Sequence, residues 1–240
     1  MEWPYILALG LAPGLAIMIY IFWKDKLNPE PLHLLFRCFL LGVLSIIPAF
    51  ILELLFQKVF PGIKSGAWVD VLIFALTGVG LVEEGCKFYF LKRSVWRSAH
   101  FDEPFDGITY SVMVSMGFAT AENIIYIFQA QTPETAFTTG ILRAFTAVPA
   151  HASFAVLMGF FIGFARFAPH RSALYQLLGL GTATVFHGAY DFFLFTQEMT
   201  GTIAGAIISL ILGVYFSYKA IQIHGGMKSI YLKDTPNIEP

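Results

Sequence analysis

Charged residues are scarce in this chain of 240 residues, where only 13% of positions are Asp, Glu, Lys or Arg. A soluble globular domain typically carries about 25% charged residues, so the composition excludes an ordinary soluble protein. The sequence also lacks a basic stripe with interleaved aromatic residues, which argues against nucleic acid as a partner. Its two cysteines, Cys38 and Cys86, lie in apolar runs and do not form the paired framework of a secreted disulfide scaffold. The 57% of hydrophobic residues instead predicts a multi-pass protein of a cell membrane, with the lipid bilayer as its surroundings.

Long apolar runs occupy most of the chain. A helical span needs about 20 mainly apolar residues, and the runs that satisfy this are 3–23, 33–56, 68–91, 107–128, 139–167, 173–195 and 202–223. We therefore predict an all-α, polytopic transmembrane bundle of about seven spans. Residues 1–223 form the transmembrane domain and residues 224–240 a short cytoplasmic tail. Asp106 is predicted to be the N-cap of the fourth span, because a carboxylate suits a helix N-terminus.

The distribution of Lys and Arg predicts the orientation of the bundle. Ten of these cations lie in the tail or in the connections that follow odd-numbered spans, whereas only Lys58 and Lys64 lie on the other side. Cytoplasmic loops carry an excess of Lys and Arg, so the N-terminus is predicted outside and the C-terminus in the cytoplasm. The three remaining cations, Arg37, Lys87 and Arg143, fall within predicted spans.

Two adjacent carboxylates, Glu83 and Glu84, interrupt the third apolar run. An ionisable group near the bilayer centre disfavours insertion by roughly 2.5 to 3.5 kcal/mol, so such residues are interpreted as functional and in need of a partner. Lys87 follows at i+4 and i+3 and can reach either carboxylate on a helix surface. Lys87 and one of the two glutamates could form a salt bridge that only holds helices together, but such a salt bridge does not need the second carboxylate. The spare carboxylate is a candidate general base.

Later runs carry further buried polar residues. Glu122 in the fourth run could be catalytic or could pair with Arg143 of the fifth, and small residues before Glu122 would let another helix approach closely. His151 follows a proline in the fifth run and is either a packing residue or a functional one. His187 and Asp191 lie at i and i+4 in the sixth, where the carboxylate could orient the imidazole. Charges in lipid are costly, so all of these groups are predicted to share one polar interior.

The order of these motifs resembles one family. Glu-Glu-x-x-Lys at 83–87, Phe-x-x-x-Glu at 118–122, a helix-borne His151 and His-x-x-x-Asp at 187–191 resemble the PrsW family of intramembrane proteases, in the superfamily of the CAAX prenyl endopeptidases. The stretches Lys24-Asp25, Glu30-Pro31 and 100–107 also look like this family.

The resemblance implies an intramembrane protease domain over residues 1–223 and a single-pass membrane protein as substrate, such as an anti-sigma factor cleaved first in a stress-signalling cascade. It implies these catalytic residues: Glu83, Glu84, Glu122, His151, His187 and Asp191. Supporting positions are Lys87, Phe118, Asn123 and Arg143. Which of the two adjacent glutamates activates water is left open.

A metal cofactor is left open as well. The sequence has no His-Glu-x-x-His zinc helix, and Lys87 beside the carboxylates would repel a cation. A glutamate mechanism is therefore favoured, although Zn²⁺ could be held by these residues: Glu84, Glu122, His151 and His187. Cys86 is a weak candidate nucleophile, because neighbouring carboxylates disfavour the thiolate.

Two other functions fit the buried charges. A proton- or ion-coupled transporter also uses acids, histidine and lysine as a relay, but the hydropathy shows no two-half symmetry of the kind many transporters have. A membrane scaffold without proteolytic activity is the other alternative.

Overall fold

A computed structural model describes residues 3–60, 67–196 and 203–234, with side chains placed as far as residue 227. All regular elements in these ranges are helical, which confirms the all-α prediction. In chain order they are α1 (Trp3–Lys24), α2 (Leu32–Val59), α3 (Trp68–Ile73), η2 (Phe74–Gly80), α4 (Leu81–Val95), α5 (Pro104–Gln129), α6 (Pro133–Phe145), α7 (Ala147–Phe167), η3 (Pro169–Arg171), α8 (Ser172–Phe195) and α10 (Ile203–Asp234).

Five helical stretches are long and apolar enough to cross a membrane, which makes this a multi-pass membrane protein. They are Pro4–Lys24, Leu32–Val59, Pro104–Gln129, Pro133–Phe167 and Ile203–Met227. Of the two other predicted runs, 68–91 is divided among α3, η2 and the 15-residue α4, and 173–195 contains His187 and Asp191, whose polarity lowers its hydropathy. The count of seven spans and the orientation therefore stay predictions.

Some predicted features lie outside the described residues. These are Lys64, residue 202 of the seventh apolar run and residues 235–240 of the predicted tail. Within the described part, helix α10 continues without a break from the seventh run through residues 224–234.

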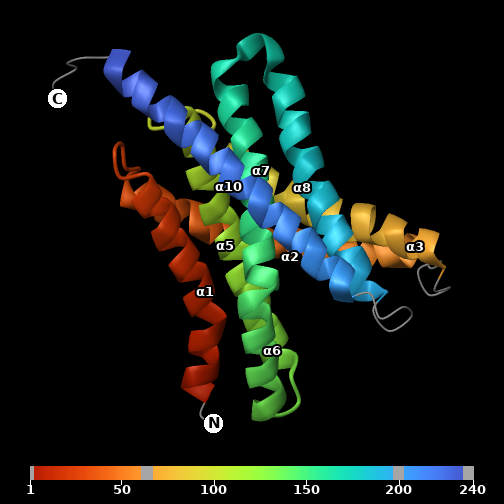
Figure 1. Cartoon of the computed structure of the whole chain (residues 1–240). Coiled ribbons are helices and arrows are strands. Elements are labelled where there is room, and N and C mark those ends of the chain that lie inside the picture. The colour runs from red at the N-terminus through yellow and green to blue at the C-terminus, as the bar shows by residue number, and fades with distance from the viewer. Residues whose placement is uncertain (1–2, 61–66, 197–202, 235–240) are drawn as a thin grey trace.

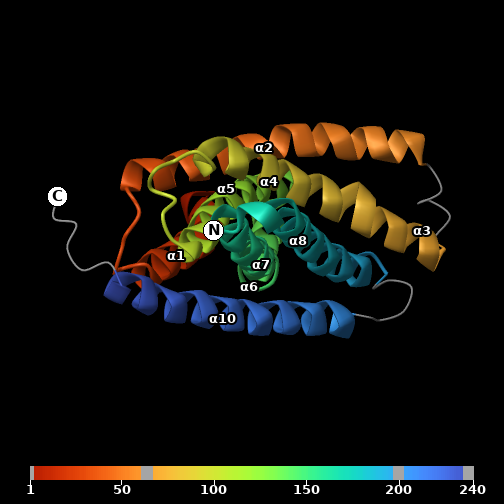
Figure 2. The ribbon, with the colours of Figure 1, turned by 90° about the horizontal axis from the view of Figure 1, so that it is seen from above.

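Helices α5 and α7 form the centre of the bundle. Nearly every residue of α5 from Pro104 to Thr120 is buried, as expected for a helix that is apolar on all sides. In Figure 2, α2 lies along one edge and α10 along the opposite edge, with α5, α7 and α8 between them. Figure 1 shows the N-terminus and α6 at one end of the bundle and the α7–α8 turn at the other.

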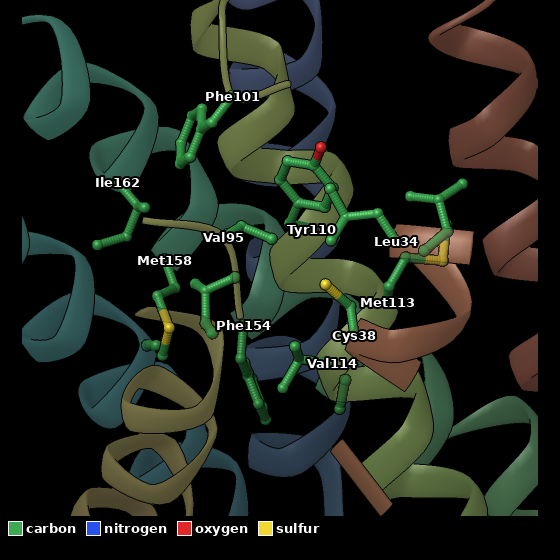
Figure 3. Packing of buried hydrophobic residues seen from close by; sticks show 14 of the residues in the cluster. Leu34, Cys38, Val95, Phe101, Tyr110, Met113, Val114, Phe154, Met158 and Ile162 are labelled. Atoms are coloured by element: carbon green, nitrogen blue, oxygen red, sulfur yellow. The ribbon is translucent and has the colours of Figure 1, made fainter. Parts of the chain in front are cut away.

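The apolar core surrounds the first half of α5. Tyr110 and Met113 of α5 lie with Phe154 and Met158 of α7 and with Cys38 of α2 in one buried cluster (Figure 3). These side chains join three helices that are distant in sequence. The core therefore holds α5 and α7 together beside Glu122, which follows the core residues on α5, and His151, which precedes them on α7.

Gly117 allows α2 and α5 to approach closely. A Cβ atom at this position would lie 2.0 Å from the carbonyl oxygen of Phe39. Only glycine fits a backbone contact this tight. The prediction that small residues before Glu122 permit a close helix approach is thus confirmed, and Glu122 is held five residues further along the same helix.

The fifth predicted span lies within the apolar stretch Pro133–Phe167, but this stretch is not one continuous helix. Helix α6 ends at Phe145 and α7 begins at Ala147, with Thr146 between them outside the helical region. Pro149 explains the break, since its ring would clash with the carbonyl group of Phe145 in a continuous helix. A proline is tolerated in the first turn of a new helix, which is where Pro149 lies.

The predicted N-cap of the fourth span is wrong. Helix α5 begins at Pro104, its N-cap is Glu103, and Asp106 is the third helical residue. Pro104 is well suited to the first helical position because it has no N–H group to satisfy. The Asp106 carboxylate instead accepts hydrogen bonds from the backbone N–H groups of Asp102 (2.9 Å) and Glu103 (2.8 Å).

Candidate active site

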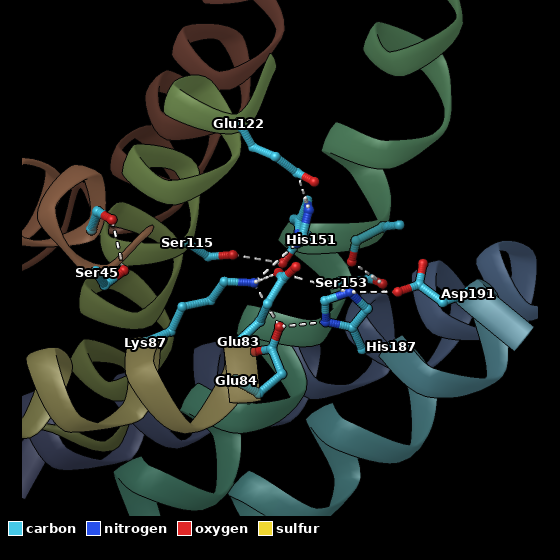
Figure 4. Close-up of polar contacts among 12 residues, drawn as sticks. Ser45, Glu83, Glu84, Lys87, Ser115, Glu122, His151, Ser153, His187 and Asp191 are labelled. Atoms are coloured by element: carbon cyan, nitrogen blue, oxygen red, sulfur yellow. Dashed lines mark hydrogen bonds and ion pairs between the residues drawn. The ribbon is translucent and has the colours of Figure 1, made fainter. Parts of the chain in front are cut away.

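The Lys87 ammonium group lies at the centre of the buried polar cluster (Figure 4). It donates hydrogen bonds to Glu83 Oε2 at 3.1 Å and to Glu84 Oε1 at 2.8 Å, as the i+4 and i+3 spacing predicts. Its third contact is His151 Nδ1 at 3.1 Å. An ammonium group has three donors and no acceptor, so these contacts satisfy it fully. Its side chain is 2% exposed.

A π-helical segment precedes the two glutamates. Segment η2 runs directly into α4, whose first turn carries Glu83 and Glu84. Such segments are rare and frequently occur at functional sites. Gly188 of α8 packs against this segment, since a Cβ atom there would lie 2.8 Å from Leu76 Cα. This close approach brings His187, the neighbour of Gly188, to the glutamates.

His187 lies between the two adjacent glutamates and Asp191. Its Nδ1 atom is 2.9 Å from Glu84 Oε1, and its Nε2 atom is 3.3 Å from Asp191 Oδ2 and 3.8 Å from Glu83 Oε2. The predicted i, i+4 pair with Asp191 is confirmed. Both ring nitrogens face carboxylate oxygens, which is the arrangement in which an imidazolium donates two hydrogen bonds.

His151 joins Lys87 to Glu122. Because the lysine can only donate, His151 Nδ1 accepts and the imidazole proton lies on Nε2, which contacts Glu122 Oε2 at 2.9 Å. Glu122 also pairs with Arg143 Nη2 at 2.5 Å, the contact that the sequence analysis gave as the alternative to a catalytic role. Arg143 Nε donates to Asn123 Oδ1 at 2.7 Å. The α6–α7 break therefore separates two site residues, Arg143 and His151, that contact the same carboxylate.

Aromatic rings enclose this network. Lys87 Nζ lies 4.1 Å from the centre of the Phe118 ring, a cation–π contact made by a predicted supporting residue. Phe154 stacks on His187 with ring centres 4.9 Å apart and an interplanar angle of 19°. Sequence reasoning missed Phe154. Its position three residues after His151 on α7 was the available signal, because residues at i and i+3 share a helix face.

A cavity of about 600 Å³ opens onto the site. Its polar wall contains Glu83, Glu122, Arg143, His151, His187 and Asp191, and its apolar walls come largely from α2, α5 and α8. Glu53 of α2 also lines it. Among the described residues Glu83 lines this cavity, whereas Glu84 lies behind it and is 0% exposed. The two adjacent glutamates thus have different surroundings.

The structure brings all six predicted catalytic residues into one network. Cys86, the weak candidate nucleophile, instead packs in an apolar cluster with Ala49 and Phe118. The predicted metal-ligand set changes in one member. Ligand atoms of Glu83, Glu84, His151 and His187 lie within 4.8 Å of one another, while Glu122 is engaged by His151 and Arg143.

Comparison with known proteins identifies the family. A family model described as PrsW family intramembrane metalloprotease matches residues 30–218. The chain is 37% identical to Protease PrsW of Bacillus subtilis (strain 168) over 79% of this chain and 82% of the relative. Protease PrsW of Geobacillus kaustophilus is 36% identical over 83% and 84%, and that of Clostridioides difficile is 35% identical over 89% and 88%. This chain belongs to the PrsW family. It is an intramembrane protease with a protein substrate in the membrane, and no solved structure matches it.

The PrsW family is described as metalloproteases, so the residues of this site must be compared with the ligands that a metal ion needs. Two histidines and two carboxylates within 4.8 Å are ligands that Zn²⁺ accepts. However, the Lys87 ammonium contacts three of these four residues, Glu83, Glu84 and His151. In this arrangement the lysine is the cation that the carboxylates surround, and a metal ion at the same point would be repelled by it. The geometry fits the ammonium group and does not fit a divalent metal.

Proposed function

We propose that this chain is an endopeptidase that hydrolyses a peptide bond of a membrane-anchored protein with a water molecule activated by Glu83. The observation that carries the proposal is the different placement of the two glutamates. Glu83 lines the cavity and is held by Lys87 through one oxygen, whereas Glu84 is buried behind it and bonded to both Lys87 and His187. Glu83 is then the carboxylate that substrate and water can reach.

The chemistry assigned to Glu83 is general acid–base catalysis. As base it takes a proton from water while the water oxygen forms a bond to the scissile carbonyl carbon. As acid it returns that proton to the leaving nitrogen when the C–N bond breaks, so Glu83 ends in its starting state. Positioned acid–base groups of this kind contribute about 10² to 10⁴ in rate.

His187 is the proposed stabiliser of the tetrahedral intermediate. Its imidazole lines the same cavity and its Nε2 atom is 3.8 Å from Glu83 Oε2, so a carbonyl attacked at Glu83 lies within reach of this donor. Hydrogen-bond donors aimed at a developing oxyanion lower the barrier most where water is excluded. Asp191 and Glu84 hold the ring in place from either side.

Glu122, His151 and Arg143 are proposed positioning residues. The chain of contacts from Arg143 to Glu122, His151 and Lys87 fixes the ammonium group that in turn fixes Glu83. Asn123 orients Arg143, and Phe118 covers the ammonium. These residues act through Lys87 and Glu83, so we expect their loss to weaken catalysis less than loss of Glu83.

The substrate is proposed to be a single-pass membrane protein such as an anti-sigma factor, cleaved in the first step of a stress response. Apolar cavity walls from α2, α5 and α8 support an apolar helical segment as the bound part. With seven spans and the N-terminus outside, the site lies toward the extracytoplasmic half of the bilayer. Residues 1–223 make up the protease domain in this proposal.

The test compares membrane proteomes of cells that carry wild type or Glu83→Gln, followed by cleavage of the protein that accumulates uncut in proteoliposomes. Glu83→Gln keeps the shape of the side chain, so we expect wild-type thermal stability and a loss of kcat/KM of about 100-fold or more. The matched control is Glu134→Gln, an exposed acid at the start of α6.

Cleavage by Glu83→Gln at the wild-type rate would remove Glu83 from its role. Ion flux in wild-type proteoliposomes, without cleavage of any membrane protein, would favour a transporter. Loss of function only from substitutions on the outer surface of the bundle would favour a scaffold.

A further inference from the structure

A second polar cluster lies far from the active site, at the start of α5. Its acidic side chains come from the end of α1, the α1–α2 connection, the segment before α5 and the first turn of α5. They are Asp25, Glu30, Asp102, Glu103 and Asp106. Asp106 and Glu122 are about 24 Å apart along the α5 axis at 1.5 Å per residue. This cluster is therefore separate from the protease site and does not depend on the function proposed there.

Asp106 belongs to two groups of converging carboxylate oxygens. In one, single oxygens of Asp25, Glu103 and Asp106 lie within 4.8 Å of one another, and all three residues are buried. In the other, Asp106 meets Glu30 and Asp102 with the same spacing. Oxygen ligands lie 2.3–2.6 Å from a bound Ca²⁺, so two ligands of one ion are at most about 5 Å apart. The observed spacing suits such an ion.

One oxygen of Asp106 points to a missing ligand. Its Oδ2 atom accepts the two backbone N–H groups of Asp102 and Glu103, which fixes the carboxylate in place. Its Oδ1 atom is buried and receives no hydrogen bond from an N–H group or hydroxyl of the described residues, and the whole residue is 0% exposed. The Glu30 carboxyl group lies close enough to share a proton with the Asp106 carboxylate. A buried carboxylate oxygen without a partner is costly and calls for an explanation, such as a bound ion.

Other contacts hold the surrounding oxygens in position. The Thr109 hydroxyl donates to Asp25 Oδ2 at 3.0 Å, and the Asn28 amide donates to Asp102 Oδ1 at 3.0 Å. These donors come from two different elements. The oxygens are thus arranged before any ligand arrives, which lowers the cost of binding one.

Negative charge is unfavourable in this cluster without a counterion. Glu30 accepts a hydrogen bond from the Tyr110 hydroxyl, but it lies beside Asp102 and Asp106, whose carboxylates carry charge of the same sign. Either shared protons or a cation must offset this repulsion.

We propose that this cluster binds one hard divalent cation, Ca²⁺ or Mg²⁺, through Asp106, Asp25 and Glu103, with Glu30 and Asp102 beside it. Carboxylate oxygens are the ligands that these ions prefer. Asp25 follows α1 and Asp106 lies in the first turn of α5, so the ion ties the end of α1 to the start of α5. The site is a structural clamp at the end of the bundle away from the protease site.

The test uses the purified full chain in detergent, with its native protease cluster. After treatment with EDTA, calorimetric titration with Ca²⁺ and then with Mg²⁺ measures stoichiometry and affinity. We expect one ion per chain, and a rise in Tm of roughly 5 °C when the free ion is at 100 times its Kd. The two titrations show which ion the site takes.

Asp106→Asn should weaken binding at least tenfold, because it removes the charge but keeps an acceptor for the two backbone N–H groups. If that variant does not fold, Asp102→Asn at an exposed edge position gives a second measurement, with a smaller but clear loss. Glu134→Gln is the matched control and should bind as the parent does.

Three results would overturn the proposal. One is that neither ion binds or raises Tm at millimolar concentration, in which case protons alone compensate the cluster. Another is equal binding by the parent and by the folded Asp106→Asn or Asp102→Asn variant. The third is binding that disappears when Glu83 and Glu84 are replaced but persists in Asp106→Asn within the otherwise native chain.

Discussion

The two polar clusters of this membrane protein differ in how their acids are compensated. At the active site, Glu83, Glu84 and Glu122 are paired with Lys87 or Arg143 of the same chain. Around Asp106, carboxylates lie next to other carboxylates. The hydrogen-bond donors there include backbone N–H groups, hydroxyls and an amide. The first cluster carries its own cations, Lys87 and Arg143. The second is arranged to take its positive charge from solution.

Of the substitutions that test this difference between the clusters, Lys87→Met should have the largest effect on stability and cleavage. It removes the internal cation and leaves Glu83 and Glu84 buried beside each other. Breaking a buried ion pair in this way typically costs about 3–5 kcal/mol. We expect a large loss of unfolding free energy, measured by denaturation in mixed micelles, together with loss of cleavage.

Lys92→Met is the matched control, because Lys92 lies on the same helix and bonds only to the Gln176 side chain among the contacts seen for it besides nearby rings. Its expected loss is about 1 kcal/mol. Equal losses for the two variants would mean that Lys87 does not compensate the glutamates.

Arg143→Met should have a smaller effect at the edge of the same cluster. Glu122 keeps its contact with His151, and the Arg143 and Glu122 side chains are 15% and 17% exposed. We expect a loss of about 1–3 kcal/mol in stability and a fall in kcat larger than any change in KM, since Arg143 acts through Glu122 and His151. Arg143→Lys should restore part of both, because it keeps the charge but not the bond to Asn123. A change confined to KM would instead place Arg143 in substrate binding.

Much of the fold and site could be predicted from local spacing. The contacts of Lys87 with Glu83 and Glu84 and of His187 with Asp191 follow from helical periodicity, and the cost of charge in lipid predicts that they converge. Pro149 also indicates the helix break at Thr146. Hydropathy does not show this break, because the residues on both sides of it are apolar.

Other features depend on the orientation of each helix about its own axis within the bundle. Whether Glu83 or Glu84 faces the cavity is decided by the packing of α4 after the π-helical segment and by the close approach at Gly188. The Asp106 cluster needs residues from three separate stretches, and the sequence shows them only as short isolated motifs. Long-range packing of this kind leaves no periodic signal in a single chain.

The effect of Asp102→Asn on Tm should have opposite signs in EDTA and in saturating Ca²⁺ or Mg²⁺. In EDTA it removes one of several repelling carboxylates, so we expect Tm to rise by about 1–2 °C. With saturating Ca²⁺ or Mg²⁺ it removes attraction to the ion, and Tm should fall below that of the parent. Differential scanning fluorimetry in both buffers measures this. A shift of the same sign in both would show that no ion compensates the cluster.

Two kinds of chelator should affect the two clusters differently. The effect on cleavage at the active site should be the smallest of all the effects predicted here. 1,10-Phenanthroline removes transition metals such as zinc but binds Ca²⁺ and Mg²⁺ weakly, so cleavage in proteoliposomes should continue unchanged if Lys87 is the cation that Glu83 and Glu84 surround. EDTA should lower Tm by stripping the Asp106 cluster, and Ca²⁺ or Mg²⁺ should restore it. Inhibition by phenanthroline that zinc reverses would show instead that a metal displaces Lys87 in the working enzyme. The carboxylates would then be ligands, and the contrast between a self-compensated site and a cation-dependent one would disappear.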